Sequence, residues 1–317
     1  MKYQEFISSK HERAENCGIE IDDSNVNQNA FDFQKAIVKW ACRKGRAGVF
    51  AAPGLGKTLI ELSWIDALTS RGQIKNSLIL CPSAVAGQIK SEAEKFDIQT
   101  ECNIAESHAD VRSGITVTNY EKLHKFDPGK FDAVVLNESS ILKGESSKTR
   151  TKLNDAFRKT RYKLSETATP APNDHMELGT QSEFLGWMQA SVMKSQFFIH
   201  DGGNTSKWRL RGHAPTDFWN WVSSWAMAIT KPSDIGFSDD GYNLPELRVH
   251  EQVIECESDF NNGLFQGGGN IAATDVHKEK RRSIEEKSRH VAEIVGHEEQ
   301  PCVIWVETNY DHEILPM

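Results

Sequence analysis

The chain has 317 residues, a hydrophobic content of 38% and a formal net charge of -8. This length accommodates one large α/β domain and part of a second, and the apolar content argues against an intrinsically disordered chain. The acidic net charge excludes a uniformly basic surface. No apolar run reaches the roughly 20 residues of a membrane span, and the polar N-terminal segment is unlike a secretory signal. We therefore expect a soluble cytoplasmic protein.

Short apolar runs alternate with helical patterns along the first half of the chain. A helix-like stretch from Phe31 to Trp40 precedes them. The strands predicted from these runs are Ala47–Ala52, Ser77–Cys81, Ile115–Thr118, Ala133–Leu136 and Tyr162–Ser165. This alternation predicts an α/β fold, in which helices sandwich a parallel sheet and ligands bind at the carboxyl ends of the strands.

The pattern changes after residue 180. There we predict a helix over Phe184–Ile199, a loop over 201–216, a helix over Phe218–Ile229, an extended Leu244–Cys256, a mobile Asn261–Ala273, a charged helix over Lys278–Val295 and a buried strand at Cys302–Val306. The predicted domain plan is a lead-in over 1–28, a first domain over 29–247 with a helical extension at 181–240, and a linker with the start of a second domain over 248–317.

A glycine-rich turn, Ala51–Thr58, lies between the first predicted strand and a helix. Gly54 and Gly56 allow backbone N–H groups to turn around a phosphate, Lys57 can reach the β- and γ-phosphates, and the Thr58 hydroxyl can bind Mg²⁺. The turn therefore predicts a site for ATP and Mg²⁺. Its predicted cofactor-binding residues are Pro53, Gly54, Leu55, Gly56, Lys57 and Thr58.

A carboxylate follows the predicted strand Ala133–Leu136. Glu138 is predicted to polarise the attacking water, while Asn137 stands where an aspartate that holds hydrated Mg²⁺ is expected. We therefore predict Thr58 and Asn137 on the metal side of the site, Asn137 through water. The neutral amide predicts retained Mg·ATP binding and a loss of ~10²–10³ in hydrolysis rate.

In this order the motifs resemble those of the superfamily-two, DEAD/DEAH-like helicases and translocases, most closely a Swi/Snf-like branch found in phage genomes. The resemblance spans roughly Gln34 to Leu247. It is carried by Gln34 in FDFQ, by Ala51–Thr58, by Leu78–Ser83 (LILCPS), by Thr116–Tyr120, by Asn137–Ser140 (NESS) and by Thr167–Pro170 (TATP).

The resemblance implies a RecA-like P-loop domain, followed by the start of a second RecA-like domain, with a second motor domain acting in cis or in trans. It implies that Gln34 reads adenine. It implies further that Thr167, Ala168 and Thr169 couple the phosphate state to the grip on nucleic acid. The residues expected to face the phosphodiester backbone are Pro82, Ser83, Thr118 and Asn119.

These expectations describe the motor domain of an ATP-dependent DNA helicase or translocase, a hydrolase that is weak as this chain. The expected partner is DNA, with duplex favoured and RNA left open, and the expected setting is the cytoplasm of a bacterium or of a phage-infected host. A non-hydrolysing, ATP-dependent nucleic-acid-binding or regulatory module is the alternative. A P-loop kinase or metabolic ATPase, which would not respond to DNA, is a third possibility.

Two further features have open interpretations at this stage. Between Lys143 and Lys163 eight Lys or Arg residues face two acids, a local balance of +6, and this fits either a solvated helix face or a phosphate-contacting surface. The Trp-rich stretch 208–225 fits core packing or stacking on bases.

Overall fold

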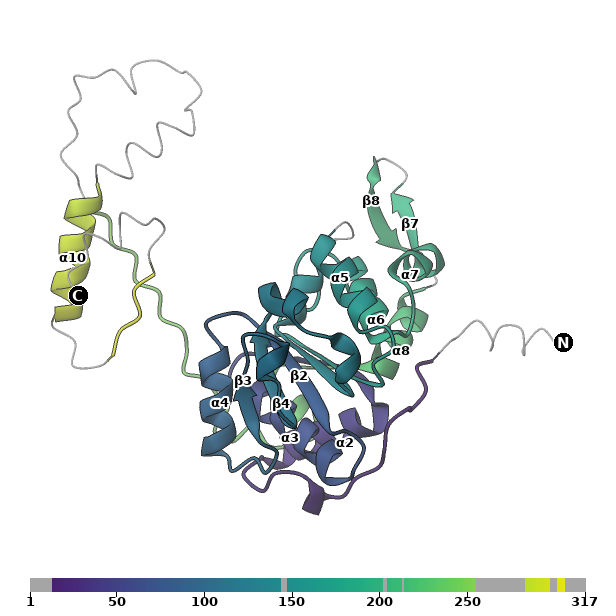
Figure 1. Ribbon diagram of the computed structural model, residues 1–317. Helices are drawn as coiled ribbons and strands as arrows, with labels where there is room; N and C mark the ends of the chain where they lie inside the picture. Colours follow the sequence, from purple (N-terminus) through teal and green to yellow (C-terminus); the bar gives the residue numbers. More distant parts are fainter. Residues whose placement is uncertain are drawn as a thin grey trace. The chain divides into compact units, whose positions relative to one another are not determined.

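The structure is a computed structural model that describes residues 13–143, 147–201, 204–212, 214–254, 283–296 and 301–305. The chain divides into two units, Met1–Asn243 and Leu244–Met317. The first unit is built on a sheet with helices around it (Figure 1). Predictions for residues 255–282, including the predicted mobile segment Asn261–Ala273, lie outside the described residues.

The central sheet has seven strands in the order β3-β4-β2-β5-β6-β1-β9, and all pairings are parallel. Its strands are β1 (Arg46–Ala51), β2 (Asn76–Cys81), β3 (Cys102–Ile104), β4 (Gly114–Asn119), β5 (Ala133–Asn137), β6 (Tyr162–Glu166) and β9 (Ala226–Ile229). The five strands predicted from apolar runs are confirmed. Sequence reasoning missed the short β3 and the edge strand β9.

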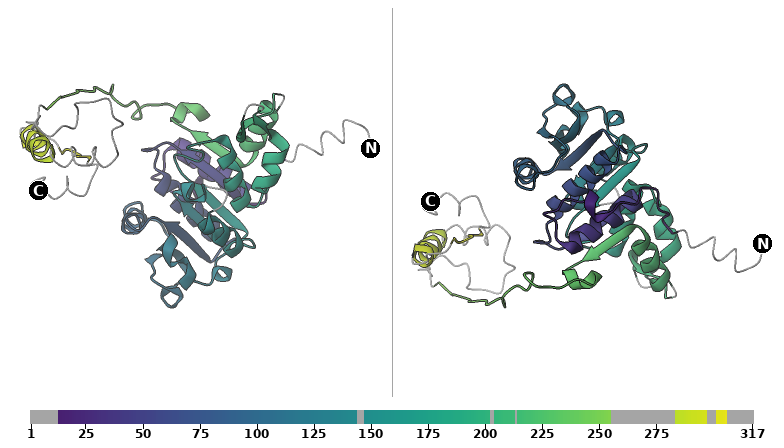
Figure 2. Two further views of the ribbon diagram at one scale, coloured as in Figure 1. Left: turned by 90° about the horizontal axis from the view of Figure 1, so that it is seen from above. Right: turned by 90° about the horizontal axis from the view of Figure 1, so that it is seen from below.

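Helices cover both faces of the sheet, as Figure 2 shows. The helices of the first unit are α2 (Asp32–Lys44), α3 (Lys57–Ser70), α4 (Ala86–Lys95), α5 (Lys148–Ala156), α6 (Leu178–Leu185), α7 (Ala190–Phe197) and α8 (Pro215–Trp225). Alternate residues of one strand enter two separate cores: Ile79 packs with the side chains of α2, α3 and α4, while Leu78 and Leu80 pack with those of α5, α6 and α8. This alternation is why the strands read as continuous apolar runs.

Helix α3 is buried on every side between the sheet and its neighbours. All residues from Leu59 to Ile65 are buried, including the polar Glu61 and Ser63. A helix enclosed in this way has little freedom to shift. It therefore holds the turn that precedes it in a fixed position at the end of β1.

The region after residue 180 differs from its prediction. The predicted helix Phe184–Ile199 is two helices, because Gly186 adopts a left-handed φ of 81° and ends α6. From Phe198 the chain forms a hairpin of β7 (Phe198–Asp201), which begins inside the predicted helix, and β8 (Asn204–Leu210), which lies within the stretch predicted as a loop. The predicted helical extension at 181–240 therefore contains strands as well as helices.

The predicted helix over Phe218–Ile229 is correct only up to Trp225. Residues Ala226–Ile229 form β9, which pairs with β1 from Gly48↔Ala226 to Ala51↔Ile229. Trp225 packs edge-on against Phe50, with ring centroids 6.2 Å apart, and anchors the change of direction. Pairing with an open sheet edge thus overrides a helical periodicity in these four residues.

The second unit contains α10 (Ile284–Gly296), which overlaps the predicted charged helix and ends one residue after it. Residues 278–282 of that prediction lie outside the described part. The predicted buried strand at Cys302–Val306 is wrong for its described residues 302–305. These residues form no strand, and Val303 and Trp305 are 79% and 91% exposed. An apolar run forms a buried strand only where a sheet receives it.

Candidate functional site

The glycine-rich turn links β1 to α3 as predicted. Gly54 and Gly56 have φ of +86° and +72°, in the left-handed region that favours glycine. No side chain caps the N-terminus of α3, so the first N–H groups of the helix point to a position that suits an anion. A Cβ at Gly54 would meet nothing within 4 Å, which leaves space beside the turn.

Lys57 and Gln34 hold the two sides of this turn. The Lys57 ammonium donates to the carbonyl oxygens of Ala51 and Ala52 at 3.0 and 3.3 Å. Gln34 is 3% exposed, and its Nε2 donates to the Leu55 carbonyl at 3.0 Å. Gln34, which the resemblance implied as the adenine reader, therefore lies against the phosphate loop and links it to α2.

Glu138 is joined to the segment after β6. It has a left-handed φ of 61°, a strained conformation for a residue with a side chain. Its Oε1 accepts a hydrogen bond of 2.6 Å from the Thr167 hydroxyl, and the Thr169 N–H donates to that hydroxyl at 3.0 Å. The predicted water-polarising residue and two of the three predicted coupling residues are thus brought together; Ala168 lies between them in the chain.

Asn137 contacts two residues that the sequence analysis did not name as site residues. Its side-chain Nδ2 donates a hydrogen bond to Glu61 Oε1 at 3.0 Å, and its backbone carbonyl oxygen accepts one from the Tyr120 hydroxyl at 2.9 Å. Glu61 is fully buried, and burial raises the pKa of its carboxyl to about 8. Glu166, at the end of β6, is also buried, and burial raises the pKa of this carboxyl well above its usual range. A single acid within the apolar stretch Leu59–Ile65 was the available sequence signal.

Gln181 on α6 is a third residue that was missed. Its Nε2 donates to the Ser139 carbonyl at 2.9 Å, and its Oε1 accepts a hydrogen bond from the Ser165 hydroxyl. This buried amide ties the residue after Glu138 to β6. It thereby fixes the spacing between the Glu138 turn and the segment that carries Thr167.

The strand ends of β2 and β4 meet on the same edge of the sheet. Asn119 Nδ2 donates a hydrogen bond to the Ser83 hydroxyl at 3.0 Å. Asn119, Ser83 and the exposed Pro82 each follow a predicted strand. Thr118 differs from its prediction, because it is 2% exposed and its hydroxyl oxygen is buried. A pocket of about 350 Å³ opens at this edge. It is lined by Cys81, Pro82, Ser83, Asn119, Tyr120, Glu121, Glu138, Ser140, Ile141 and Lys143.

The basic stretch and the tryptophans occupy different environments. Lys163 is buried and donates to the Phe184 carbonyl at 2.7 Å, and the half-buried Arg150 lies 3.6 Å from Glu183. The other basic residues of the stretch are exposed, namely Lys143, Lys148, Lys152, Arg158, Lys159 and Arg161. Trp221 and Trp225 lie in the core, which agrees with the core-packing interpretation of the Trp-rich stretch, while Trp219 is 44% exposed.

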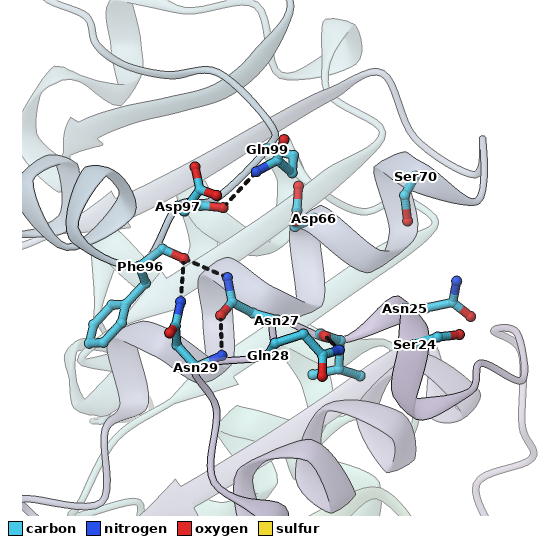
Figure 3. Close-up of a pocket in the computed structure, with 11 residues that line it drawn as sticks. Ser24, Asn25, Asn27, Gln28, Asn29, Asp66, Ser70, Phe96, Asp97 and Gln99 are labelled. Atoms are coloured by element: carbon cyan, nitrogen blue, oxygen red, sulfur yellow. Dashed lines mark hydrogen bonds between the residues drawn. The ribbon is translucent and has the colours of Figure 1, made fainter.

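A second pocket lies near the opposite end of α3 from the phosphate loop. Figure 3 shows its lining, in which Asn27 and Asn29 both donate to the Phe96 carbonyl, at 2.7 and 3.1 Å. Asp66 accepts hydrogen bonds from the Thr100 N–H and hydroxyl. These polar groups are used in hydrogen bonds with one another. The hydrogen bonds hold together the loops around this pocket. Among the described residues no cluster of three metal-ligating side chains occurs, and no helix is long and apolar enough to span a membrane.

Comparisons with known proteins point to one kind of domain. Residues 24–172 match the family model "Type III restriction enzyme, res subunit". The fold matches the Sulfolobus solfataricus SWI2/SNF2 ATPase core in complex with dsDNA, with a TM-score of 0.59 and 20% identity over 70% of this chain and 48% of that one. The SWI2/SNF2 ATPase core domain of the same organism gives a TM-score of 0.55 at 19% identity, over 66% of this chain and 45% of that one.

A curated relative matches over a shorter stretch. The DNA excision repair protein CSB of Oryza sativa subsp. japonica is 33% identical over 70 residues, which is 21% of this chain and 6% of that protein. The chain thus spans less than half the length of each of these relatives. The first unit thus has a RecA-like α/β fold similar to that of the SWI2/SNF2 ATPase cores, and its residues 24–172 are similar to the family model "Type III restriction enzyme, res subunit".

Proposed function

We propose that this chain is the ATP-binding motor domain of an ATP-dependent DNA helicase or translocase. The observation that supports this most directly is the hydrogen bond between Thr167 and Glu138. Glu138 follows β5 and lines the pocket that contains Ser83 and Asn119. A change at the γ-phosphate would therefore be transmitted over few bonds to the strand ends that face nucleic acid.

The phosphate loop would hold the triphosphate of ATP. Backbone N–H groups at the start of α3 and the Lys57 ammonium supply donors and positive charge to the phosphate oxygens. We propose that Gln34, which contacts the loop at the Leu55 carbonyl, reads the base. The residues present also fit Mg²⁺, which prefers oxygen ligands. The Thr58 hydroxyl and the Asn137 side chain would supply oxygen atoms, and the buried Glu61 carboxyl supports Asn137 through a hydrogen bond. Mg²⁺, when bound, would neutralise charge on the phosphates.

Hydrolysis would use Glu138 as the residue that orients and polarises water. The water oxygen forms a bond to the γ-phosphorus while the bond to the β–γ bridging oxygen breaks, and this gives ADP and phosphate. Thr167 holds the Glu138 carboxylate in one orientation. We propose that turnover is slow, because the neutral Asn137 amide stands where a charge would stabilise the reacting phosphates, and one such group is worth ~10²–10³ in rate.

Nucleic-acid contact would come from Pro82, Ser83 and Asn119. Hydroxyl and amide groups at strand ends suit phosphate contacts, which position a strand without reading its sequence. The complex of the SWI2/SNF2 core with dsDNA favours duplex DNA as the partner. We propose that movement along DNA requires closure against a second motor domain, in cis or in trans.

A non-hydrolysing, ATP-dependent module is the second candidate function. The Asn137 amide favours it, because this side chain donates to Glu61 and brings no charge of its own. The two candidates agree on Mg·ATP binding and differ only in turnover.

Calorimetry with Mg·ATP tests the shared claim. We expect a binding heat that Lys57→Ala abolishes and that Lys90→Ala, a matched change on the exposed face of α4, leaves unchanged. Turnover with and without duplex DNA then separates the candidates: DNA-stimulated phosphate release that Glu138→Gln removes supports the motor. Binding with no release under any condition supports the module, and no binding heat in the unmodified chain contradicts both. Release that duplex DNA leaves unchanged favours a metabolic ATPase.

A further inference from the structure

Tyr120 lies between two parts of the proposed site. Its ring packs against the core on the side of α5 and α6, and its hydroxyl donates a hydrogen bond of 2.9 Å to the backbone carbonyl of Asn137. This carbonyl belongs to the peptide bond that joins Asn137 to Glu138. Tyr120 also lines the pocket that contains Ser83 and Asn119. One side chain therefore reaches from the proposed nucleic-acid contacts to the backbone of the proposed water-polarising residue.

Side chains hold the backbone on both sides of Glu138. Tyr120 binds the carbonyl before it, and Gln181 Nε2 donates at 2.9 Å to the carbonyl after it, that of Ser139. Between these two hydrogen bonds Glu138 has a left-handed φ of 61°, a conformation that persists only where the surroundings enforce it. Gln181 is buried in the core, whereas Tyr120 forms part of the pocket wall. A shift of Tyr120 would therefore change the orientation of Glu138.

The residue before Tyr120 connects it to the expected position of a DNA phosphate. The Oδ1 atom of Asn119 caps the short helical turn Tyr120–Lys125, while its Nδ2 donates to the Ser83 hydroxyl at 3.0 Å. A phosphate oxygen is a strong acceptor and competes with that hydroxyl for the Nδ2 donor. The same amide thus contacts the proposed ligand with one end and the turn that begins at Tyr120 with the other.

We propose that Tyr120 couples contact with DNA to the orientation of Glu138. When a phosphate takes the Asn119 donor, the capped turn shifts, and the Tyr120 hydroxyl carries this shift to the peptide bond before Glu138. The coupling also acts in reverse, because linkage between two binding sites is reciprocal. Tyr120 is thus a positioning residue. It provides a route on the opposite side of β5 from Thr167, since the strand order is β4-β2-β5-β6. This inference rests on the proposed function.

A purely structural role for the Tyr120 hydroxyl makes a different prediction. A hydroxyl that only satisfies the Asn137 carbonyl stabilises the fold to the same extent with or without ligands. A hydroxyl that couples the two sites changes the effect of one ligand on the affinity for the other. The ratio of two affinities therefore distinguishes the two roles.

The test measures the factor by which nucleotide changes the affinity for DNA. Fluorescence anisotropy follows a labelled duplex with and without a saturating, non-hydrolysable ATP analogue and Mg²⁺, and the ratio of the two dissociation constants is the coupling factor. We expect a factor of about 10 in the unmodified chain. Tyr120→Phe keeps the ring and removes the hydroxyl, and it should bring the factor to within about 2-fold of unity. Because the factor is a ratio within one variant, a change of affinity at one site alone leaves it unaltered.

Tyr162→Phe is the matched control. The Tyr162 hydroxyl also donates to a partner, Gln73 Oε1 at 3.0 Å, but this residue begins β6 and so lies at the other end of the strand from the site. Its variant should keep the full coupling factor, and thermal unfolding reports whether both variants are folded. A folded Tyr120→Phe chain with an unchanged factor overturns the proposal, as does an unmodified chain that binds both ligands without coupling.

Failure of the proposed function is visible before any variant is compared. An unmodified chain that does not bind the ATP analogue, or does not bind the duplex, contradicts the proposed function itself. An unmodified chain that binds both with a factor near unity leaves that function standing and contradicts the role of Tyr120 alone.

Discussion

The Thr167 hydroxyl donates a hydrogen bond of 2.6 Å to Glu138 Oε1, across 29 positions of sequence. Thr167 has no exposed surface, and its oxygen also accepts from the Thr169 N–H. One hydroxyl therefore joins the strained turn after β5 to the turn after β6. It directly links the proposed water-polarising carboxylate to the proposed coupling segment.

Removing this hydroxyl should slow DNA-stimulated turnover. We expect Thr167→Val to lower kcat about 10-fold to 100-fold, because Glu138 loses its orienting donor, while the affinity for ATP changes little. Thr167→Ser keeps the hydroxyl and should retain most of the activity. Steady-state phosphate release checks both. A Thr167→Val chain with unchanged turnover would show that the hydrogen bond does not matter.

Gly56 cannot carry a side chain. Its φ is +72°, and a Cβ there would lie 2.3 Å from Gln34 Nε2. Gly56→Ala should therefore displace Gln34, lower the unfolding free energy by about 1–3 kcal/mol and weaken ATP binding.

Gly87→Ala is the matched control for that change. Gly87 lies within α4, and a Cβ there would meet nothing within 4 Å. Alanine should stabilise this helix by about 0.5–1 kcal/mol without affecting ATP. Denaturant unfolding and nucleotide titration measure both variants. A Gly56→Ala chain with normal ATP affinity would contradict the placement of Gln34 against the loop.

Asn119 should contribute to DNA binding without reading sequence. Its Oδ1 caps the turn that begins at Tyr120 by accepting from the Lys122 N–H, while its Nδ2 donates to Ser83. Asn119→Asp keeps the capping acceptor but removes the donor and adds a charge that repels phosphate. We expect it to weaken duplex binding about 10-fold, by the same factor for unrelated sequences, at low salt. Asn103→Asp on β3 is the control, and fluorescence anisotropy with two duplexes measures the effect.

Lys163 predicts a rise in stability at alkaline pH. Burial, and then repulsion by Arg46, lowers the pKa of its ammonium from 10.5 to about 8. Between these two values the unfolded chain binds more protons than the folded one, so the unfolding free energy rises with pH, by up to about 3 kcal/mol from this residue. In Lys163→Met this contribution should vanish.

Chemical denaturation between pH 7.5 and 10 measures the difference between the two chains. Lys159→Met, an exposed change in the same basic stretch, should keep the pH dependence of the unmodified protein. A parallel pH course for Lys163→Met and the unmodified chain would show that Lys163 does not titrate in this range.

The sequence was sufficient wherever local chemistry decides the outcome. The glycine-rich turn between β1 and α3 could be predicted because glycine adopts a positive φ, as Gly54 and Gly56 do, without steric cost. Five buried strands could be predicted because a strand covered on both faces is apolar along its whole length. Asn137 and Glu138 followed, since they come directly after one of those strands.

Only the tertiary structure decided which distant residues meet. Glu61 and Asn137 are 76 positions apart, and Gln181 joins Ser139 and Ser165 from a helix whose place no periodicity specifies. Ala226–Ile229 became a strand because β1 offered an open edge, and Thr118 turned inward because the pleat of β4 directs it there. Strand order and side-chain direction are set by contacts between segments, and a single sequence does not display those contacts.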